Sequence, residues 1–436
     1  MMRRKPDLSF WKLWNLSFGF FGVQIAYSLQ SANISRIFAT LGADPHTLSW
    51  FWVLPPAMGM LVQPIVGTLS DKTWTRFGRR LPYLFVGAAA AVLVMCLLPN
   101  AGSFGLTVGA ALWFGACALM FLDTSINMAM QPFKMLVGDM VNEPQKVKAY
   151  SIQSFLCNAG GIIGFVFPFL FTAIGIANTA PSGVVPDSVI YSFYIGAAIL
   201  ILCVIYTTVK VKEWNPVEYA EYNGASEQKE ESANWFTLLK KAPAAFWQVG
   251  LVQFFCWAAF LYMWNYTTGA ISDTVWGTTE VASAGYQEAG NWTGIVFAVQ
   301  TLGAVVWAMV LPQFRKAKIA YALSLVLGGV GFAMVPFVHD QYLLFLPFAM
   351  IGCAWAAMLA MPFAMVTNAL QGYGHMGAYL GLFNCTICIP QILAALLGGV
   401  ILSLVGSHQY NMMEVAAVCL FVGAVCVFGI RSKTSR

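Results

Sequence analysis

One acidic residue inside an apolar stretch is the strongest candidate for chemistry in this sequence. Asp123 lies in Phe121-Leu-Asp-Thr-Ser-Ile-Asn127, well inside an apolar run over 106–136. A carboxylate in such a setting costs roughly 3 kcal/mol or more, so acids there usually face a wet cavity and serve a function. Burial favours the uncharged form of a carboxyl group, which suits a group that takes up and releases a proton. An acid held by hydroxyl and amide neighbours for structural reasons is the alternative.

Polar and aromatic side chains at helical spacing accompany this acid. Asn127 and Gln131 follow Asp123 at i+4 and i+8, which places all three on one stripe of a helix. Further sets occupy other apolar runs: Gln24, Tyr27, Ser28 and Ser31 near the start, and Trp257, Trp264 and Asn265 in the second half. Amides and hydroxyls suit a polyhydroxylated ligand, and aromatic faces can stack on a sugar ring. Hydrogen bonds between helices and interfacial aromatic belts are the structural alternatives.

A compact charged loop follows the second apolar run. Its members are Gly67, Asp71, Arg76, Gly78, Arg79 and Arg80, and Asp139 begins a comparable charged cluster after the fourth run. Such a loop can lock helix ends by ion pairs that break when two halves of a protein move. Charges that merely keep a loop on one side of a membrane would explain the cations, but not Asp71 and the two glycines. Arg36 is a possible ion-pair partner for Asp123.

The elements that must position these residues are membrane-spanning helices. The chain of 436 residues is 59% hydrophobic and only 9% charged, which is far from the balance of a soluble domain. Its apolar runs each reach about 20 residues, enough to cross a bilayer. We predict an all-α integral membrane protein with twelve spans, near 13–38, 48–69, 81–99, 106–136, 148–176, 188–209, 245–270, 289–312, 319–338, 341–368, 376–405 and 412–430.

One long polar stretch divides the spans six and six. It covers 211–243, so we expect an N-terminal half over 1–210 and a C-terminal half over 244–436. A repeated pattern supports duplicated halves, because Pro132-Phe-Lys-Met and Pro362-Phe-Ala-Met are each followed by Ala-Tyr at almost the same interval. Within the linker, 234–241 resembles a short amphipathic surface helix, and a solvated linker is the alternative.

The charge distribution predicts orientation and argues against other classes of protein. With both termini cytoplasmic, basic residues gather on that side, around 3–5, 72–80, 146–148, 210–241, 315–318 and 431–436. The net charge of +5 is therefore a topology signal, and we expect no nucleic-acid partner. Ten cysteines lie inside apolar spans and four histidines are scattered over loops and span ends. These residues form no metal-ligand or catalytic pattern, so we expect no metal, no cofactor and no enzyme activity.

The pattern of these motifs resembles the major facilitator superfamily, in the sucrose/proton symporter-like branch of the glycoside-pentoside-hexuronide:cation symporters. That branch includes plant sucrose transporters and their animal and bacterial relatives. The resemblance rests on short sequence motifs that occur in the same order and spacing as in the family. These motifs are Gly22-Val-Gln24, Gly59-Met-Leu-Val-Gln63-Pro64, Ser70-Asp71, Arg76-Phe-Gly-Arg-Arg80, Leu122-Asp123, Asn127, Pro132 and Asp139. Gly381, Asn384, Ile387 and Pro390-Gln391 resemble its eleventh-helix pattern.

The resemblance implies a major facilitator fold and a proton-coupled symporter that imports a sugar by alternating access. It implies the proton-site role for Asp123, a sugar site between the halves to which Asn384 contributes, and a disaccharide α-glucoside such as sucrose or maltose as substrate. An exporter or exchanger of another small polar solute is the alternative. The related melibiose symporters carry paired acids on the second helix for sodium, whereas residues 48–69 contain none, so the resemblance favours protons over sodium. We expect a functional monomer in a cell membrane, that of a bacterial inner membrane.

This chain also departs from the family. The plant members carry charged residues in and just after the seventh helix, where this chain has Thr267, Gly269 and, farther on, Asp273. Its sugar contacts in the second half are therefore expected to differ. Lys134 stands where many relatives have Arg, which keeps the charge but loses the planar donor fork.

Overall fold

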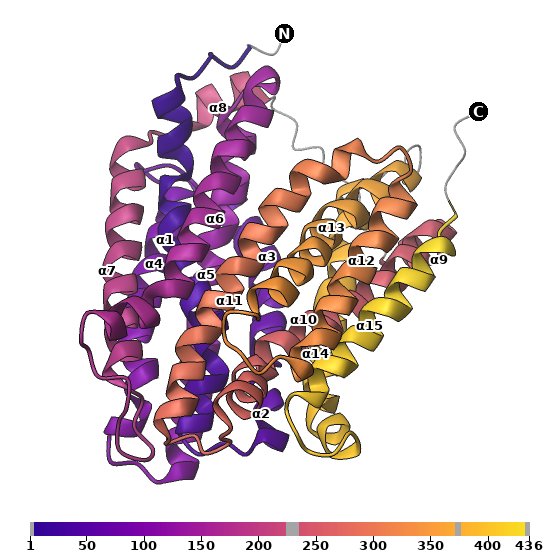
Figure 1. Ribbon diagram of the computed structural model, residues 1–436. Coiled ribbons are helices and arrows are strands. Elements are labelled where there is room, and N and C mark those ends of the chain that lie inside the picture. Colours follow the sequence, from indigo (N-terminus) through magenta and orange to yellow (C-terminus); the bar gives the residue numbers. More distant parts are fainter. Residues whose placement is uncertain (1–3, 224–234, 371–375, 432–436) are drawn as a thin grey trace. The chain divides into compact units, whose positions relative to one another are not determined.

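The computed structural model describes residues 4–223, 235–370 and 376–431, and these form helices joined by short connections (Figure 1). The helices are α1 (Phe10–Thr40), α2 (Pro45–Phe51), α3 (Leu54–Lys72), α4 (Leu81–Leu97), α5 (Val108–Met140), α6 (Glu143–Ala173), α7 (Asp187–Lys210), α8 (Pro216–Asn223), α9 (Trp235–Lys241), α10 (Ala244–Trp276), α11 (Ala284–Val310), α12 (Ala317–Met334), α13 (Phe345–Ala369), α14 (Met376–Leu404) and α15 (Asn411–Phe428). The ends of the chain and part of the predicted linker, including Asn234, lie outside the described residues.

The predicted set of twelve transmembrane helices is confirmed. Within the described ranges, eleven stretches are long and apolar enough to cross a membrane, and α2 and α3 together form one of them. α1 is not among the eleven because Gln, Ser and Asn residues recur along it. Its 31 residues nevertheless reach roughly 46 Å at 1.5 Å per residue, more than a bilayer core of about 30 Å requires. α1 is therefore the first of the twelve spans.

Local sequence signals explain where the helices that carry the candidate site begin. α5 starts after Thr107, whose side chain accepts a hydrogen bond from the backbone N–H of Ala110. α6 starts after Asn142, which accepts in the same way from Gln145. Ser9 caps α1 by accepting from Lys12. These side chains satisfy backbone donors that have no partner within their own helix.

The chain divides into two compact units, which are described separately. One unit comprises Met1–Gly42 and Ala57–Gln228, and the other Ala43–Pro56 and Lys229–Arg436. In the first unit α1 packs against α6 and α7, and α4 packs against α5 and α7. In the second unit α10 packs against α14 and α15, and α12 against α13 and α15. The short helix α2 packs against α14 and so belongs to the second unit, although it lies early in the sequence.

Small residues allow α1 and α6 to approach closely. A Cβ atom added at Gly160 would lie 2.4 Å from the carbonyl oxygen of Phe21, and one added at Gly164 would lie 2.7 Å from that of Ile25. Both distances are shorter than van der Waals contact, so only glycine fits at these positions. Close backbone approach at small residues is the usual way that helices associate in membranes.

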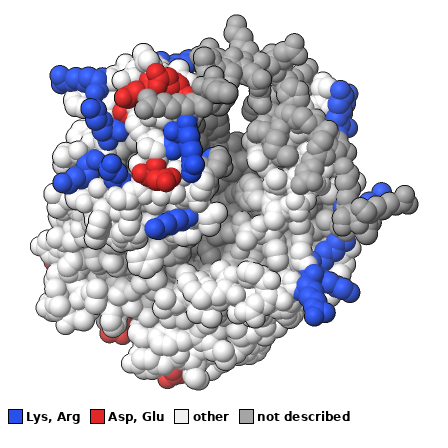
Figure 2. Space-filling view, turned by 90° about the horizontal axis from the view of Figure 1, so that it is seen from above, with Lys and Arg blue, Asp and Glu red and all other residues white. Residues whose placement is uncertain are grey.

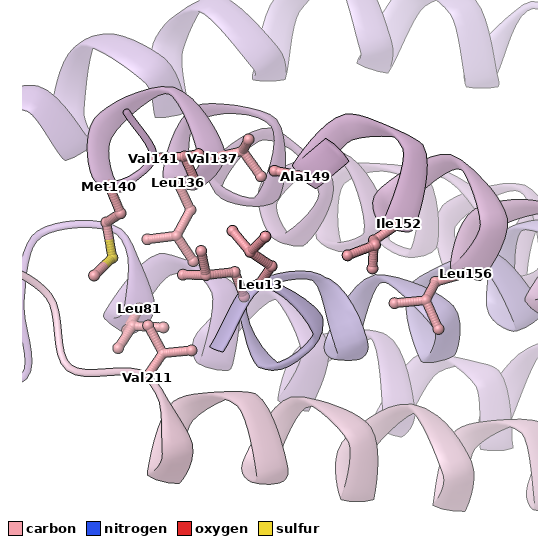
Figure 3. Packing of buried hydrophobic residues seen from close by; sticks show 11 residues of the cluster. Leu13, Leu81, Leu136, Val137, Met140, Val141, Ala149, Ile152, Leu156 and Val211 are labelled. Atoms are coloured by element: carbon pink, nitrogen blue, oxygen red, sulfur yellow. The ribbon is translucent and has the colours of Figure 1, made fainter. Parts of the chain in front are cut away.

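A hydrophobic cluster holds the first unit together at the end where its chain begins (Figure 3). It joins the start of α1, the start of α4, the end of α5, the start of α6 and the segment after α7. Its members are Leu13, Leu16, Leu81, Leu136, Val137, Met140, Val141, Ala149, Ile152, Leu156 and Val211. Burial of each large side chain stabilises the fold by about 2 kcal/mol where water is the alternative surrounding. The cluster therefore fixes the helix ends beside the charged loop.

Candidate functional site

Asp123 is buried in the first unit with a single side-chain partner. It lies on α5 with 2% of its surface exposed, and its Oδ1 accepts a hydrogen bond from Nε2 of Gln30 on α1. The other carboxylate oxygen, Oδ2, is buried and has no partner among the described residues. The possible ion pair with Arg36 is not present, and Arg36 instead donates to Asn178 at 2.8 Å. Within the described part of the chain, Asp123 thus has no cationic partner to stabilise its charged form.

A row of amides continues from Asp123 along α5. The amide of Asn127 donates to the backbone oxygen of Asp123 at 2.8 Å, and Gln63 on α3 donates to Oδ1 of Asn127 at 2.7 Å. Gln131 follows one turn later, and a Cβ atom added at Gly67 would lie 3.7 Å from its Nε2. The predicted stripe is therefore a real polar row that extends from the buried acid toward the charged loop. Sequence reasoning did not assign Gln63 or Gln30 to this row.

Some of the predicted polar residues on α1 serve helix packing, and one keeps an unused hydrogen-bond acceptor. Ser28 is buried beside Gly161 and Gly164 of α6, and Ser31 donates to the backbone oxygen of Tyr27 at 2.8 Å. Gln24 keeps a buried side-chain oxygen that has no partner in the described part of the chain. Gln24 therefore has the most capacity to accept a ligand hydroxyl, and the binding roles of Tyr27, Ser28 and Ser31 stay predictions.

Four tryptophans gather in the second unit. Trp257 and Trp264 of α10 both contact Trp355 of α13, with ring centroids 5.6 Å and 5.8 Å apart, and Trp52 stacks on Trp264 at 6.3 Å. Sequence reasoning predicted Trp257 and Trp264 but missed Trp52, which lies in the turn after α2, and Trp355, which lies on α13. Together the four rings form an aromatic cluster, and aromatic faces of this kind can stack on a sugar ring.

Buried amides lie on α10, the helix that carries Trp257 and Trp264. Gln253, one turn before Trp257, is fully buried, and neither of its amide atoms has a partner among the described residues. The indole N–H of Trp257 is likewise buried and without a partner there. Asn265 is fully buried on α10. The amide of Asn384 on α14 donates to Sγ of Cys388 at 4.0 Å, and no hydrogen bond joins Asn384 to the tryptophans in the described structure.

The charged loop forms a dense ion-pair network in the first unit. Asp139 accepts from Arg79 at 2.8 Å and from Arg80 at 3.0 Å, and Asp71 accepts from Arg80 at 2.5 Å. Burial is the largest single influence on the pKa of Arg79 and lowers it, but Asp139, Tyr219 and Asp71 together outweigh burial, so the pKa is raised and the guanidinium stays charged. Figure 2 shows Lys and Arg beside Asp and Glu side chains on the face where α8 lies. Arg76 contacts the ring of Phe77 at 4.7 Å and makes no ion pair within the described ranges.

Two residues from the segment after α7 complete this network, and sequence reasoning missed both. The carboxylate of Glu213 accepts from the backbone N–H groups of Arg79, Arg80 and Leu81 at 2.7–3.1 Å. It thereby caps α4, whose own N-cap residue makes no side-chain cap. Burial raises the pKa of Glu213, and the three N–H donors oppose the rise. The guanidinium of Arg79 lies over the ring of Tyr219 on α8, with its central carbon 3.9 Å from the ring centroid.

Gly78 is required by this cap. Its φ of +112° is a conformation that L side chains rarely adopt, and an added Cβ atom would lie 2.6 Å from the Glu213 carboxylate. The predicted motif therefore includes a glycine for a specific reason, which is the close approach of Glu213.

Comparisons with known proteins place the chain among transporters. The sequence model of the family described as MFS/sugar transport protein matches residues 18–417. The chain is 21% identical to sucrose transport protein SUC4 of Arabidopsis thaliana, over 93% of this chain and 86% of that protein. It is 23% identical to sucrose transport protein SUT5 of Oryza sativa subsp. indica, over 87% of this chain and 79% of that protein.

Other matches are partial or concern the fold alone. Proton-associated sugar transporter A of Mus musculus is 27% identical over 168 residues, which is 37% of this chain, and the match spans only about a fifth of that protein, 22%. The crystal structure of the nucleoside transporter NupG has a TM-score of 0.69 at 14% identity, covering 97% of this chain and 99% of that one. The crystal structure of a POT family transporter in complex with 5-aminolevulinic acid has a TM-score of 0.69 at 12% identity, covering 96% of this chain and 95% of that one. These relatives are transporters, not enzymes, and the chain belongs to the MFS/sugar transport protein family.

Proposed function

We propose that this chain is a proton-coupled symporter that imports a sugar by alternating access, with Asp123 as the proton site. The observation that carries the proposal is the carboxylate of Asp123 itself, which is 2% exposed and, among the described residues, has one amide partner and no cationic partner. A buried carboxylate without a cation is costly when charged, so it exchanges its proton only when its surroundings change. That property is what coupling requires.

The free oxygen of Asp123 supplies a physical link between proton and sugar. An ionised carboxylate only accepts hydrogen bonds, whereas a protonated one also donates. Oδ2 has no partner among the described residues, so a sugar hydroxyl that reached it would interact differently with the two forms. A ligand shifts an equilibrium only through such differential interaction. The row through Asn127, Gln63 and Gln131 is the proposed polar route for the proton.

The sugar class follows from the remaining polar and aromatic residues. Gln24 offers a buried acceptor that has no partner among the described residues, and the four tryptophans offer aromatic rings on which a sugar could stack. The names of the plant relatives support sucrose or another α-linked disaccharide as the substrate. A site built for two rings would bind a monosaccharide poorly, because each buried hydroxyl or amide left without a partner costs about 1–3 kcal/mol.

We further propose that the protein lies in a cell membrane with both termini cytoplasmic, and that it functions as a monomer. The concentration of basic residues around 72–80 and 210–212 supports this orientation, because positive residues are retained on the cytoplasmic side. We expect the protein to belong to a bacterial inner membrane.

Uptake by proteoliposomes tests the function directly. With an imposed pH gradient, alkaline inside, we expect labelled sucrose or maltose to accumulate above its external concentration, and a protonophore to abolish the accumulation. Glucose, melibiose and a nucleoside serve as comparison substrates. Glucose uptake equal to that of both α-glucosides would refute the disaccharide claim. Counterflow of the nucleoside with no response to any sugar would refute sugar transport.

A further inference from the structure

A pocket at the end of the first unit is lined by three lysines, one from the start of α1 and two from the stretch where α7 ends. It has a volume of about 270 Å³ and lies between the start of α1, the end of α7 and the segment leading to α8. Lys12, Lys210 and Lys212 line it, together with Asn15 and Trp214. A single water needs only about 10–15 Å³ of such volume, so the pocket has room for a much larger group. It lies beside the cluster of Figure 3, because Leu16, Met140 and Val211 also line it.

The polar groups of this pocket have unused capacity. None of the ammonium groups of Lys12, Lys210 and Lys212 makes an ion pair or hydrogen bond within the described structure. The indole N–H of Trp214 is buried there and has no partner among the described residues. The two acids in the lining are already engaged, since Glu213 caps α4 and Glu218 accepts from the backbone N–H of Asn215 at 3.2 Å. The pocket therefore presents several donors and positive charges without matching acceptors.

The surface beside the pocket is apolar and exposed. Leu202 is 65% exposed and Val209 75% exposed on α7, and Trp11 is 68% exposed on α1. Tyr206, on the same side of α7, donates its hydroxyl hydrogen to Asn15 of the pocket at 2.9 Å. A ligand with a phosphate head and acyl tails would fit both the pocket and the apolar surface, the head at the lysines and the tails along α7. Free phosphate would use only the pocket.

We propose that this pocket binds the phosphate group of an anionic phospholipid from the adjacent leaflet. The leaflet is cytoplasmic if the proposed orientation holds, and the inference does not depend on the sugar or the proton. Basic pockets at the ends of transmembrane helices bind anionic head groups, and each nearby lysine changes the affinity about fivefold. Bound lipid would tie α1 and α7 to the segment that carries Glu213.

Lipid retention by the purified full-length protein tests this site. We compare the triple variant Lys12→Gln, Lys210→Gln, Lys212→Gln with a control of equal charge change in the other unit, Lys240→Gln, Lys241→Gln, Lys316→Gln. Phosphatidylglycerol is titrated in detergent against phosphatidylcholine, and binding is read by native mass spectrometry and by the rise in melting temperature. We expect wild-type and control to bind phosphatidylglycerol alike, and the pocket variant to bind it roughly 100-fold more weakly.

The same experiment distinguishes the source of the phosphate and the role of the indole. Trp214→Phe keeps the ring and removes the N–H, so we expect a smaller loss of affinity than in the triple variant. Inorganic phosphate is added to delipidated protein in a separate arm, and we expect it not to raise the melting temperature. A rise in melting temperature with phosphate equal to that with lipid would overturn the lipid assignment. Equal losses in the pocket and control variants would overturn the site.

Discussion

The cap that Glu213 provides for α4 can be tested by replacing it with glutamine. The amide retains an oxygen that can accept from Arg80 and Leu81. Its NH₂ group, however, faces the backbone N–H of Arg79, which in the wild-type protein donates to the Glu213 carboxylate at 3.1 Å. One buried N–H without a partner costs about 1–3 kcal/mol. Loss of a negative charge at a helix N-terminus costs about 0.3–1 kcal/mol more. The expected destabilisation is therefore roughly 1–4 kcal/mol.

The assay is thermal unfolding in detergent, read by a thiol-reactive dye. Buried free cysteines, such as Cys203 in the first unit and Cys256 in the second, react only when their helices open. Glu218→Gln is the matched control, because Glu218 is an exposed acid on the same segment with only local contacts. We expect a clear fall in melting temperature for Glu213→Gln and almost none for Glu218→Gln. Equal melting temperatures for the two variants would refute the capping argument.

Three further predictions concern transport in proteoliposomes. Asp71→Asn should bind sugar normally and transport it more slowly, since Asp139 still holds both arginines; loss of binding in a folded variant would contradict the gating role. Gln30→Leu removes the one side-chain partner that Asp123 has among the described residues and should lower uphill accumulation about tenfold while leaving sugar exchange; undiminished accumulation would show that the amide is dispensable. Trp264→Ala should weaken sugar affinity more than Trp264→Phe, which keeps a stacking face; equal affinities would argue against stacking.

The sequence was sufficient to predict the helices and the buried acid. Apolar runs of about 20 residues have one explanation in a chain of this composition, and Asp123 is conspicuous because carboxylates are rare in such runs. α1 also illustrates the limit of composition, because its polar residues lower its hydropathy although it spans a bilayer by length.

The partners of the site residues could not be predicted from the sequence. Gln30 contacts Asp123 across 93 residues, and the contact depends on which face α1 turns toward α5. Glu213 looked like an ordinary linker charge, yet it caps a helix that begins 132 residues earlier. Trp52 and Trp355 come from separate apolar runs, where an aromatic residue is unremarkable. Such pairings depend on tertiary packing, which local periodicity does not specify.

The most direct test of the proton site compares sugar-driven proton movement in wild-type, Asp123→Asn and Asp187→Asn proteoliposomes. Asp187 is a matched acid at the start of α7, outside the buried row. With a pH indicator in the external medium, the account predicts that adding sucrose or maltose alkalinises the medium for wild-type and Asp187→Asn. It predicts no pH change for Asp123→Asn, in which counterflow of the same sugar persists. Sugar-driven alkalinisation by Asp123→Asn equal to that of wild-type would contradict the assignment of Asp123 as the proton site.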